Sequence, residues 1–429
     1  MERKKILIIT YYWPPAGGPG VQRWLKFVKY LPEFEIEPLV YCPENPHYPI
    51  LDETLHTEVS SGLKIFKQPI KEPYQFAQLF SKTDTKKISS GIIPKAKKQS
   101  LIQKLLLFIR GNFFIPDARK NWVKPSIEFL TPLIEKEGID TIITTGPPHS
   151  LHLIGLELKS LFPLKWIADF RDPWTTIGYH EQLKLTAKSQ KRHKELEQKV
   201  LQAAHAIIVT SFNTKKEFEL KTQQPIHVIT NGYDKVLNVK TEKDKNFSIA
   251  HIGSLLSDRN PKLLWEVLSE LCSEIADFKD HLEIKLIGVV SEEIVKSLSE
   301  HQLIAYLKNY GYVSHKEALE HQKKSQILLL IEINSTATKA IIPGKLFEYM
   351  ISETPIVAIG PEDSDVETII RHTNTGAYFN YSDKARLKQH ITTCFEDFLN
   401  GSLRVNAIGL EPYSRRSLTK QLAEVVEMV

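Results

Sequence analysis

Cysteine is scarce in this chain, which has three cysteines among its 429 residues. Cys42, Cys272 and Cys394 are far apart and odd in number, which argues against a disulfide framework and against a cysteine zinc site. The chain also lacks any apolar run near the roughly 20 residues that a membrane-spanning helix needs. The chain starts with basic residues, but the apolar run that follows them is cut short by Trp13-Pro14-Pro15, too early for a signal-peptide core. We therefore expect reduced thiols and a cytoplasmic location, or a peripheral one on the inner face of the cytoplasmic membrane.

A large excess of one charge is absent as well, because 56 Lys and Arg accompany 51 Asp and Glu. This small net charge points to no particular partner. Hydrophobic residues make up 42% and charged residues 25% of the chain, which excludes a disordered protein. At about 150 residues per domain, the length predicts two or three folded domains.

Short β-rich runs alternate with longer segments of helical period, a pattern typical of parallel sheets covered by helices. The polar segment 235–246 separates two sets of such runs and is interpreted as a linker. The sequence thus predicts two α/β domains, with a terminal helix over 413–429. The expected strands are 6–10, 38–42, 141–145, 165–170, 206–210 and 226–230 in the first set, and 247–253, 283–288, 305–310, 327–331, 355–359 and 376–379 in the second.

Positive charge is concentrated in residues 81–124, which hold eleven Lys and Arg against Asp84 and Asp117. Within this stretch, residues 101–115 carry many large apolar side chains. A basic and apolar segment can rest on an anionic lipid surface or guide an amphiphilic substrate. The alternative is a solvated insertion followed by a packed helix. No nucleic-acid recognition motif accompanies the charge, so we expect no nucleic-acid partner.

A glycine-rich loop follows the first expected strand and contains Gly17, Gly18 and Gly20. Glycines let backbone N–H groups approach a ligand closely, and the start of the following helix favours negative charge. The loop suits a phosphate or a sugar. It lacks the Gly-Lys-Ser/Thr of a P-loop and the spacing of the dinucleotide fingerprint, so a plain turn without a ligand remains an alternative.

A second candidate site lies at Asp169, Arg171 and Asp172, where another expected strand ends. The carboxyl ends of parallel strands face the ligand crevice of an open sheet, so these groups could bind a sugar or a charged group. His149 follows the preceding strand and belongs at the same edge. A turn or helix cap at Asp172 and an exposed loop position for His149 are the structural alternatives.

A third site is the segment 342–350, in which Pro343 and Gly344 start a helix and Lys345 and Glu348 share one helix face. A nucleoside diphosphate fits this pair, with Lys345 at the phosphates and Glu348 at the ribose hydroxyls. A plain salt bridge between the two side chains is the alternative. A fourth site, 253–261, mirrors the first loop in position, and its Arg259 could offer two parallel donors to a phosphate.

The order of these four sites, with Thr230-Asn231-Gly232-Tyr233-Asp234 between the halves and Gly311-Tyr312-Val313-Ser314 in the second, resembles glycosyltransferase family 4. The resemblance covers nearly the whole chain outside the basic stretch. It implies a GT-B fold, with two Rossmann-like doubly wound domains, parallel sheets and an interdomain cleft. Residues 1–234 would then bind the acceptor, 247–410 the nucleotide sugar, and the helix in 411–429 would pack back on the first domain.

Carried over by this resemblance, Lys345 and Arg259 would neutralise the leaving diphosphate and Glu348 would bind the ribose. The backbone from Tyr312 through Val313 to Ser314 would face the base. The acceptor side would hold the catalytic candidates His149, Asp169, Arg171 and Asp172. The donor would further contact Gly17, Gly18, Gly20, Gly253, Pro343 and Gly344.

The chain departs from the family pattern at three positions. Ala340 occupies the place of the first of two glutamates eight residues apart, Ser254 stands where many members have Arg, and Arg171 falls near a commonly catalytic His. Asp363-Ser364-Asp365 looks like a metal-binding Asp-x-Asp, but so short a match is frequent by chance, and we interpret it as a loop.

The resemblance implies a transferase that moves a sugar from a nucleoside-diphosphate sugar onto a glycan or lipid-linked acceptor, with retention, in cell-surface polysaccharide synthesis. No cofactor and no metal is expected. Two alternatives stay open: an isomerase of the sugar-nucleotide 2-epimerase kind, and a protein that binds a glycan or nucleotide sugar without turnover. Peripheral contact with an anionic membrane is a separate hypothesis, which assigns a role to Lys95, Lys97 and Lys98.

Overall fold

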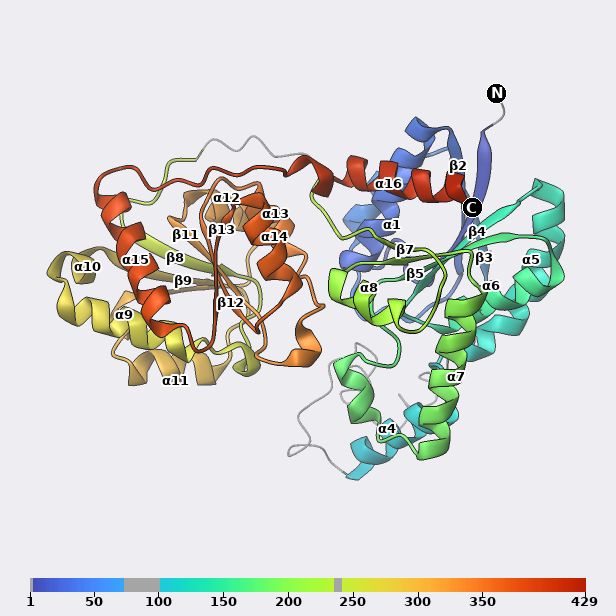
Figure 1. Ribbon diagram of the computed structural model, residues 1–429, viewed down its shortest axis with the longest axis horizontal. Coiled ribbons are helices and arrows are strands. Elements are labelled where there is room, and N and C mark those ends of the chain that lie inside the picture. The colour runs from blue at the N-terminus through green and yellow to red at the C-terminus, as the bar shows by residue number, and fades with distance from the viewer. Residues whose placement is uncertain (1–2, 73–100, 235–240) are drawn as a thin grey trace. The chain divides into compact units, whose positions relative to one another are not determined.

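The computed structural model describes residues 3–72, 101–234 and 241–429 (Figure 1). The chain forms two compact units. Unit 1 comprises Met1–Asn231 together with Arg415–Val429, and unit 2 comprises Gly232–Ser414. Each unit is an α/β structure built around one parallel sheet, as the alternation of short apolar runs and helical segments predicts.

Unit 1 holds a seven-stranded sheet in the order β3-β2-β1-β4-β5-β6-β7, with all neighbouring strands parallel. The order reverses between β1 and β4, which is where doubly wound sheets bind ligands. The central strands are apolar on both faces because helices cover both. The strands are β1 Lys4–Ile9, β2 Ile36–Pro43, β3 Lys64–Gln68, β4 Thr141–Gly146, β5 Lys165–Phe170, β6 Ala206–Val209 and β7 Ile226–Val228.

Two hydrophobic cores lie on the two faces of this sheet. Helices α1 and α16 cover one face, whereas α5, α6 and α7 cover the other (Figure 1). The helices are α1 Pro19–Tyr30, α4 Leu101–Phe113, α5 Val123–Glu137, α6 Ser150–Leu161, α7 Ala187–Ala203, α8 Phe212–Glu219 and α16 Arg415–Met428, with short 3-10 turns η1 Leu31–Phe34, η2 Glu53–Glu58, η4 Lys120–Trp122 and η5 Gly178–Leu183.

Unit 2 repeats this plan with six parallel strands in the order β10-β9-β8-β11-β12-β13. Its order reverses between β8 and β11, the counterpart of the reversal in unit 1. The strands are β8 Phe247–Ile252, β9 Leu282–Ile287, β10 Leu307–Gly311, β11 Ile327–Ile331, β12 Ile356–Gly360 and β13 Gly376–Asn380.

The helices of unit 2 again form two layers around the sheet (Figure 1). They are α9 Lys262–Glu274, α10 Ala276–His281, α11 Glu292–Glu300, α12 His315–Lys324, α13 Lys345–Met350, α14 Asp365–Thr373 and α15 Lys384–Leu399, with 3-10 turns η6 Ser257–Arg259, η7 Ile304–Tyr306, η8 Thr336–Thr338 and η9 Glu411–Tyr413.

All twelve expected strands are present, and β3 is an additional one. Its sequence, KIFKQ, has lysines on either side of Ile65 and Phe66, and its side chains are exposed or only partly buried. Ile65 packs against one core and Phe66 against the other, while the two lysines are exposed, as is common in an edge strand. A search for continuous apolar runs therefore passes over it.

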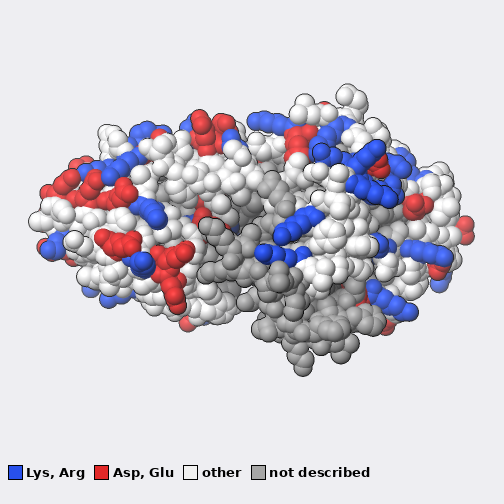
Figure 2. Space-filling model, turned by 90° about the horizontal axis from the view of Figure 1, so that it is seen from below, with Lys and Arg blue, Asp and Glu red and all other residues white. Residues whose placement is uncertain are grey.

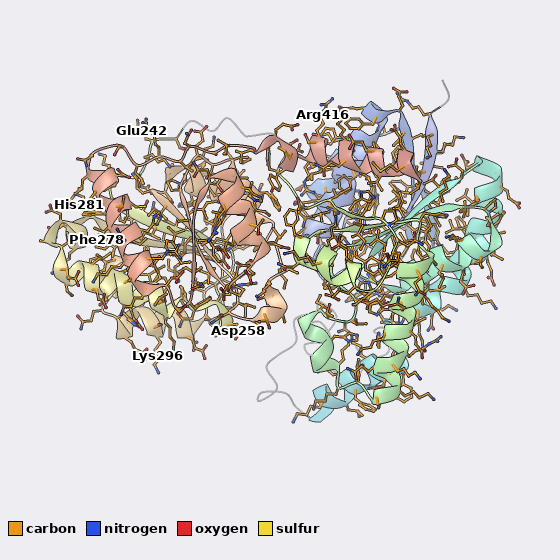
Figure 3. All side chains as sticks on the ribbon, in the orientation of Figure 1. Glu242, Asp258, Phe278, His281, Lys296 and Arg416 are labelled. Atoms are coloured by element: carbon orange, nitrogen blue, oxygen red, sulfur yellow. The ribbon has the colours of Figure 1, made fainter. Side chains whose placement is uncertain are left out.

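The terminal helix α16 belongs to unit 1. It packs on α1, and Leu418, Leu422 and Val425 join the same core as Trp24 of α1. At its start, Arg416, labelled in Figure 3, forms an ion pair of 2.6 Å with Glu33.

The lysines of the membrane hypothesis, Lys95, Lys97 and Lys98, lie outside the described residues. So do residues 235–240 of the expected linker. The end of that linker packs on unit 2. Asp244 pairs with Lys285 at 2.6 Å, and Lys243 donates hydrogen bonds to Ser325 O and Thr354 Oγ1. Within the described ranges, no helix has the length and apolar character needed to cross a bilayer.

Candidate functional site

Lys345 lies at the carboxyl edge of the unit 2 sheet. Its ammonium donates a hydrogen bond to Ile252 O at 2.9 Å and lies 2.8 Å from His251 Nε2. Ile252 is the last residue of β8, so the side chain of α13 reaches back over the strand end. Burial, aided by the positive charge of Arg259, lowers the pKa of Lys345 to about 7. The same surroundings hold the pKa of His251 well below its usual range.

Arg259 is the second cation at this edge. It ends η6, directly after the loop that follows β8, and its side chain is partly buried. Its charge lowers the pKa of Lys345 and of His251, and also opposes the rise in the pKa of Glu332. Two basic side chains held close together, and partly shielded from water, form a strong site for a polyanion such as a diphosphate.

Glu348 lies one helical turn after Lys345, with its carboxylate directed toward α12. One oxygen lies 3.2 Å from His315 Nε2, and the other accepts a hydrogen bond of 3.2 Å from Gln322 Nε2. About a third of the side chain is exposed, at 36%. Lys345 and Glu348 are thus held by separate partners, which differs from the plain salt bridge considered above. The helix itself begins at Lys345, with Gly344 as its N-cap after Pro343.

Glycines end three neighbouring strands of unit 2. Gly253, Gly288 and Gly311 have φ angles of 105°, 122° and 65°, in the region that favours glycine. A β-carbon on Gly288 would lie 2.6 Å from Gly253 O, so the two strand ends pack backbone against backbone. Sequence reasoning found Gly253 and Gly311 but missed Gly288, whose signal is its place directly after an apolar strand.

The segment after β10 contains an exposed tyrosine, Tyr312, and a helix-capping serine, Ser314. Tyr312 is 90% exposed, and Val313 is partly buried. Ser314 is the N-cap of α12: its hydroxyl accepts a hydrogen bond from Glu317 N, and Glu317 Oε2 accepts one from Ser314 N. The Ser314 side chain is therefore committed to the helix end, and Tyr312 is the large exposed side chain of this segment.

Glu332 is a site residue that sequence reasoning missed. It directly follows β11 and is 4% exposed. Its carboxyl group accepts hydrogen bonds from Tyr378 OH at 2.8 Å and Ser364 Oγ at 2.9 Å, and burial raises its pKa to about 7. The sequence could have indicated Glu332, because it is a carboxylate directly after an apolar run predicted to be a parallel strand.

The Asp363-Ser364-Asp365 segment serves the loop in which it lies. Asp363 pairs with Lys339 at 3.5 Å, and Ser364 caps α14 by accepting a hydrogen bond from Val366 N. Across the described parts of the chain, no cluster of three or more His, Cys, Asp and Glu side chains has the arrangement to hold a metal ion.

In unit 1, Asp169 is a fully buried carboxylate with three donors. Arg23 Nη2 lies 3.1 Å from one oxygen, and the other accepts hydrogen bonds from Trp24 Nε1 at 3.0 Å and Thr145 Oγ1 at 2.7 Å. Arg23 also donates to Thr230 O at 2.7 Å. Asp169 therefore ties β4, β5 and α1 together. Sequence reasoning missed Arg23, whose position within an amphipathic helix resembles that of an ordinary surface residue.

Arg171 lies over the glycine loop. Its backbone N–H donates to Gly146 O at 2.9 Å, and its guanidinium donates to Pro147 O and lies 5.7 Å from the Tyr12 ring centre. A β-carbon on Gly20 would overlap the Arg171 guanidinium, so this glycine leaves the space that the side chain occupies. The structure brings Arg171 and Gly20 together, as expected for strand and helix ends that meet at one sheet edge.

Gly17 and Gly18 shape the start of this loop. Gly17 N donates to Ile50 O at 3.0 Å. Gly18, with a φ of 106°, is the N-cap of α1, and Pro19 occupies the first helical position. Asp172, which follows Arg171 in the chain, is partly exposed; burial raises the pKa of its carboxyl group, the nearby Arg171 lowers it, and Asp169 raises it further.

His149 belongs to a group of buried histidines. It stacks on Trp174, with ring centres 5.0 Å apart, and neither of its ring nitrogens has a hydrogen-bond partner within the described residues. Its neighbour His152 lies 2.8 Å from Thr144 Oγ1 through Nδ1. Burial holds the pKa of His149 well below its usual range and lowers that of His152 to about 3. Both imidazoles are neutral at physiological pH.

These histidines predict a loss of stability in mild acid. Below about pH 6.5, His149 and His152 become protonated in the unfolded chain but stay neutral in the folded protein. The free energy of unfolding should therefore fall from pH 6.5 downward, by up to about 1.4 kcal/mol per pH unit for each histidine. Urea unfolding followed by tryptophan fluorescence would measure it, because five of the six tryptophans are in unit 1.

The control for this experiment is the exposed His372. His152→Gln should flatten the pH dependence, whereas His372→Gln should leave it unchanged. Equal slopes for the wild type and His152→Gln would contradict the prediction.

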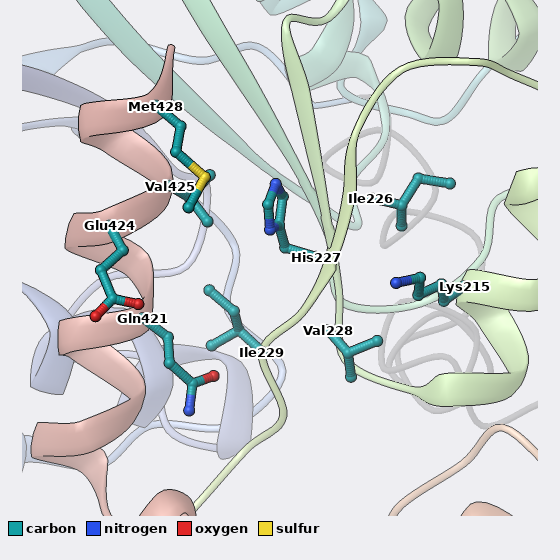
Figure 4. A pocket seen from close by; sticks show the side chains of 9 residues that line it. All are labelled: Lys215, Ile226, His227, Val228, Ile229, Gln421, Glu424, Val425 and Met428. Atoms are coloured by element: carbon teal, nitrogen blue, oxygen red, sulfur yellow. The ribbon is translucent and has the colours of Figure 1, made fainter.

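A pocket of unit 1 lies apart from these residues, between β7 and α16 (Figure 4). None of its lining residues is one of the candidate site residues described above. Its lining comes from Lys215, the segment 226–229 that includes β7, and Gln421, Glu424, Val425 and Met428 of α16.

Comparisons with known proteins identify the architecture. No protein-family model matches the chain, and no curated protein matches it in sequence. Among solved structures, a glycosyltransferase from Rickettsia africae is 12% identical with a TM-score of 0.60, covering 100% of this chain and 99% of that one. Sucrose-phosphate synthase from Thermosynechococcus elongatus is 12% identical with a TM-score of 0.58, covering 99% of each chain.

A third structure, Anabaena Alr3699/HepE in complex with UDP and glucose, is 13% identical with a TM-score of 0.57, covering 100% of each chain. At such identities the likeness carries the fold and no more. With its seven- and six-stranded parallel sheets in two α/β units, the chain has the GT-B fold.

Proposed function

We propose that the chain is a glycosyltransferase that moves a sugar from a nucleoside-diphosphate sugar to a glycan or lipid-linked acceptor in cell-surface polysaccharide synthesis. The proposal includes retention of configuration, which comes from the resemblance to family 4. It requires neither a metal nor another cofactor.

The observation that carries the proposal is the pair of cations at the carboxyl edge of unit 2. Lys345 is fixed by His251 and Ile252 O, and Arg259 is close enough to lower its pKa. Departure of a nucleoside diphosphate develops negative charge on the phosphates. Fixed cations in a partly buried site stabilise that charge without reorganising during the reaction. Lys345 and Arg259 would supply this stabilisation.

The other donor contacts follow from their places around this pair. Glu348 is one turn along α13 and partly exposed, which suits a carboxylate that accepts hydrogen bonds from ribose hydroxyls. The exposed Tyr312, with Val313 and the backbone of Ser314, would face the base. Gly253 allows a phosphate to approach the backbone closely at the end of β8.

On the acceptor side, we propose different roles for the four residues. Arg171 and Asp172 are the groups with exposed surface, and the raised pKa of Asp172 suits a proton-transfer role. Asp169 and His149 are buried, so they would position the strand ends that carry Arg171 and Asp172. Gly17, Gly18 and Gly20 of the loop next to Arg171 would contact the donor through their backbone.

The names of similar structures support the same class of reaction. One is a glycosyltransferase, and one was solved in complex with UDP and glucose. These names describe those proteins; for this chain they make UDP a sensible first nucleotide to test.

The test is incubation of the intact chain with a panel of nucleotide sugars and extracted acceptors, read as release of a nucleoside diphosphate. The double variant Lys345→Ala/Glu348→Ala should lower the rate by at least about 100-fold, since one lost electrostatic contact costs roughly that much. The matched control is Lys296→Ala/Glu300→Ala, a surface pair of α11 with a spacing of 3.8 Å. Lys296 is labelled in Figure 3.

Full activity of the Lys345/Glu348 variant would contradict the site assignment. Consumption of a nucleotide sugar without any acceptor would instead indicate an isomerase. Tight binding of a nucleotide sugar with no turnover under any acceptor would indicate a binding protein.

A further inference from the structure

Helix α4 carries an apolar stripe that faces solvent. Leu105, Ile109 and Phe113 are 58%, 36% and 63% exposed. They are spaced four residues apart, which places them on one face of the helix. Scattered apolar residues are normal on a protein surface. Three that lie next to each other along one helix face form a continuous patch, which is typical of an interaction site.

The opposite face of α4 is anchored to unit 1. Leu107 and Leu183 are buried against each other with Leu106 and Leu185 around them. A β-carbon on Gly111 would lie 2.7 Å from Leu185, so α4 approaches this segment very closely. The Asn112 side chain also accepts a hydrogen bond from Thr186 N at 2.8 Å and donates one to Lys184 O at 3.3 Å. The stripe is therefore presented outward by a fixed helix.

Cations from two distant parts of the sequence surround this stripe. The first part contributes Lys104 and Arg110 on α4, Lys120 in η4 and Lys124 at the start of α5. The second part, 183–194, contacts α4 through its first residues and contains five Lys and Arg with no Asp or Glu: Lys184, Lys188, Lys191, Arg192 and Lys194. All nine side chains are at least partly exposed. The second group was not part of the basic stretch recognised in the sequence.

Negative charge near these cations is limited. Asp117 is the only acid in 101–124, and its carboxylate accepts hydrogen bonds from Ser150 N and Oγ, both at 2.9 Å. Glu195 pairs with Lys191 and Arg192 at 4.0 and 3.7 Å, and Glu128 pairs with Lys124 at 3.9 Å. Figure 1 shows α4 beside the start of α7, and Figure 2 shows Lys and Arg side chains on the same side of the molecule, seen from below.

We propose that this surface, the α4–α7 surface formed by the α4 stripe and the nine cations around it, rests on an anionic lipid membrane. An apolar helix face flanked by Lys and Arg is the arrangement that inserts shallowly between anionic headgroups. A second copy of the chain would bring the same positive charge to the contact and be repelled. The inference stands on the surface alone and does not depend on the proposed transferase reaction.

The test uses the intact chain and co-sedimentation with vesicles of phosphatidylcholine, with or without phosphatidylglycerol. Binding is expected only to the anionic vesicles and should weaken as salt is raised. Lys184→Gln/Lys188→Gln/Lys194→Gln should reduce the affinity on the order of 100-fold at low salt. The matched control replaces three exposed lysines of unit 2: Lys279→Gln/Lys296→Gln/Lys308→Gln.

A second variant tests the apolar stripe. Leu105→Ser/Ile109→Ser/Phe113→Ser should lose vesicle binding while keeping the wild-type melting temperature, because these side chains are exposed. Its control is Leu161→Ser/Leu220→Ser/Ile408→Ser, which replaces apolar residues that are 58%, 89% and 57% exposed elsewhere. All variants keep residues 73–100, so the comparison isolates the described surface.

Three results would overturn the proposal. One is equal binding to neutral and anionic vesicles, or no binding to either. Another is unchanged binding by both the stripe variant and the lysine variant. The third is a wild-type dimer in analytical ultracentrifugation that becomes a monomer in the stripe variant, which would mean that a second copy covers the surface.

Discussion

Replacing Asp169 with alanine is expected to lower the free energy of unfolding by about 3–5 kcal/mol, the usual cost of breaking a buried ion pair. Arg23 and Asp169 are both fully buried. The variant would leave a guanidinium inside the protein with no compensating carboxylate, and would also remove the acceptor for Trp24 and Thr145. Urea unfolding followed by tryptophan fluorescence measures the change.

Two further variants separate the ion pair from a general effect of losing a carboxylate. Glu128→Ala removes an exposed partner of Lys124 and should change stability by less than about 1 kcal/mol. Arg23→Met/Asp169→Leu removes both charges and should be less destabilised than Asp169→Ala alone. If the double variant were the less stable of the two, the uncompensated charge would not be the cause.

Binding of a nucleoside diphosphate is expected to take up a proton at Lys345 above neutral pH. In the free protein, burial and Arg259 lower the pKa of Lys345 to about 7. A bound diphosphate favours the charged ammonium and raises that pKa. Affinity should therefore be highest where Lys345 is already protonated, and should fall as pH rises above 7, by up to about tenfold per pH unit. Calorimetry with UDP, or with the nucleotide that the donor panel identifies, measures the affinity at each pH. Repeating it in two buffers of different ionisation enthalpy gives the number of protons taken up.

The control for this experiment is Lys345→Arg, because an arginine stays charged throughout this range. It should bind with an affinity that changes little between about pH 7 and 9, and without net proton uptake. The ligand titrates identically with both proteins, so a difference between them belongs to residue 345. Equal pH dependence of the wild type and Lys345→Arg would contradict the assignment.

The fold could be predicted from local patterns because its strands are buried on both faces. Runs such as Ile327–Ile331 are apolar throughout, and their neighbours carry helical periodicity. β3 was missed because lysines flank its two apolar residues, so this edge strand contains no continuous apolar run. The buried strands could thus be predicted from their local composition. The edge strand could not, because it is defined by its pairing with β2.

The candidate site was predictable only in part. Residues that follow strands, such as Lys345 after its loop and Arg171 after β5, could be placed at one edge by the rule for parallel sheets. The side chains that contact these residues could not be predicted. Arg23 and His251 lie within regular elements, and only the tertiary fold brings them to Asp169 and Lys345. The same holds for the basic residues at the start of α7, whose nearness to α4 has no signal in the sequence.

The course of the chain also sets an order of synthesis. Unit 1 begins with β1 but is completed by α16, and all of unit 2 lies between them. Leu418, Leu422 and Val425 of α16 cover the core that Ile6 and Ile8 of β1 help to form. Domains generally fold from the N-terminus during translation. Here the part of unit 1's apolar face that α16 covers beside α1 stays uncovered until residues 415–429 have been made, so unit 2 can finish folding first.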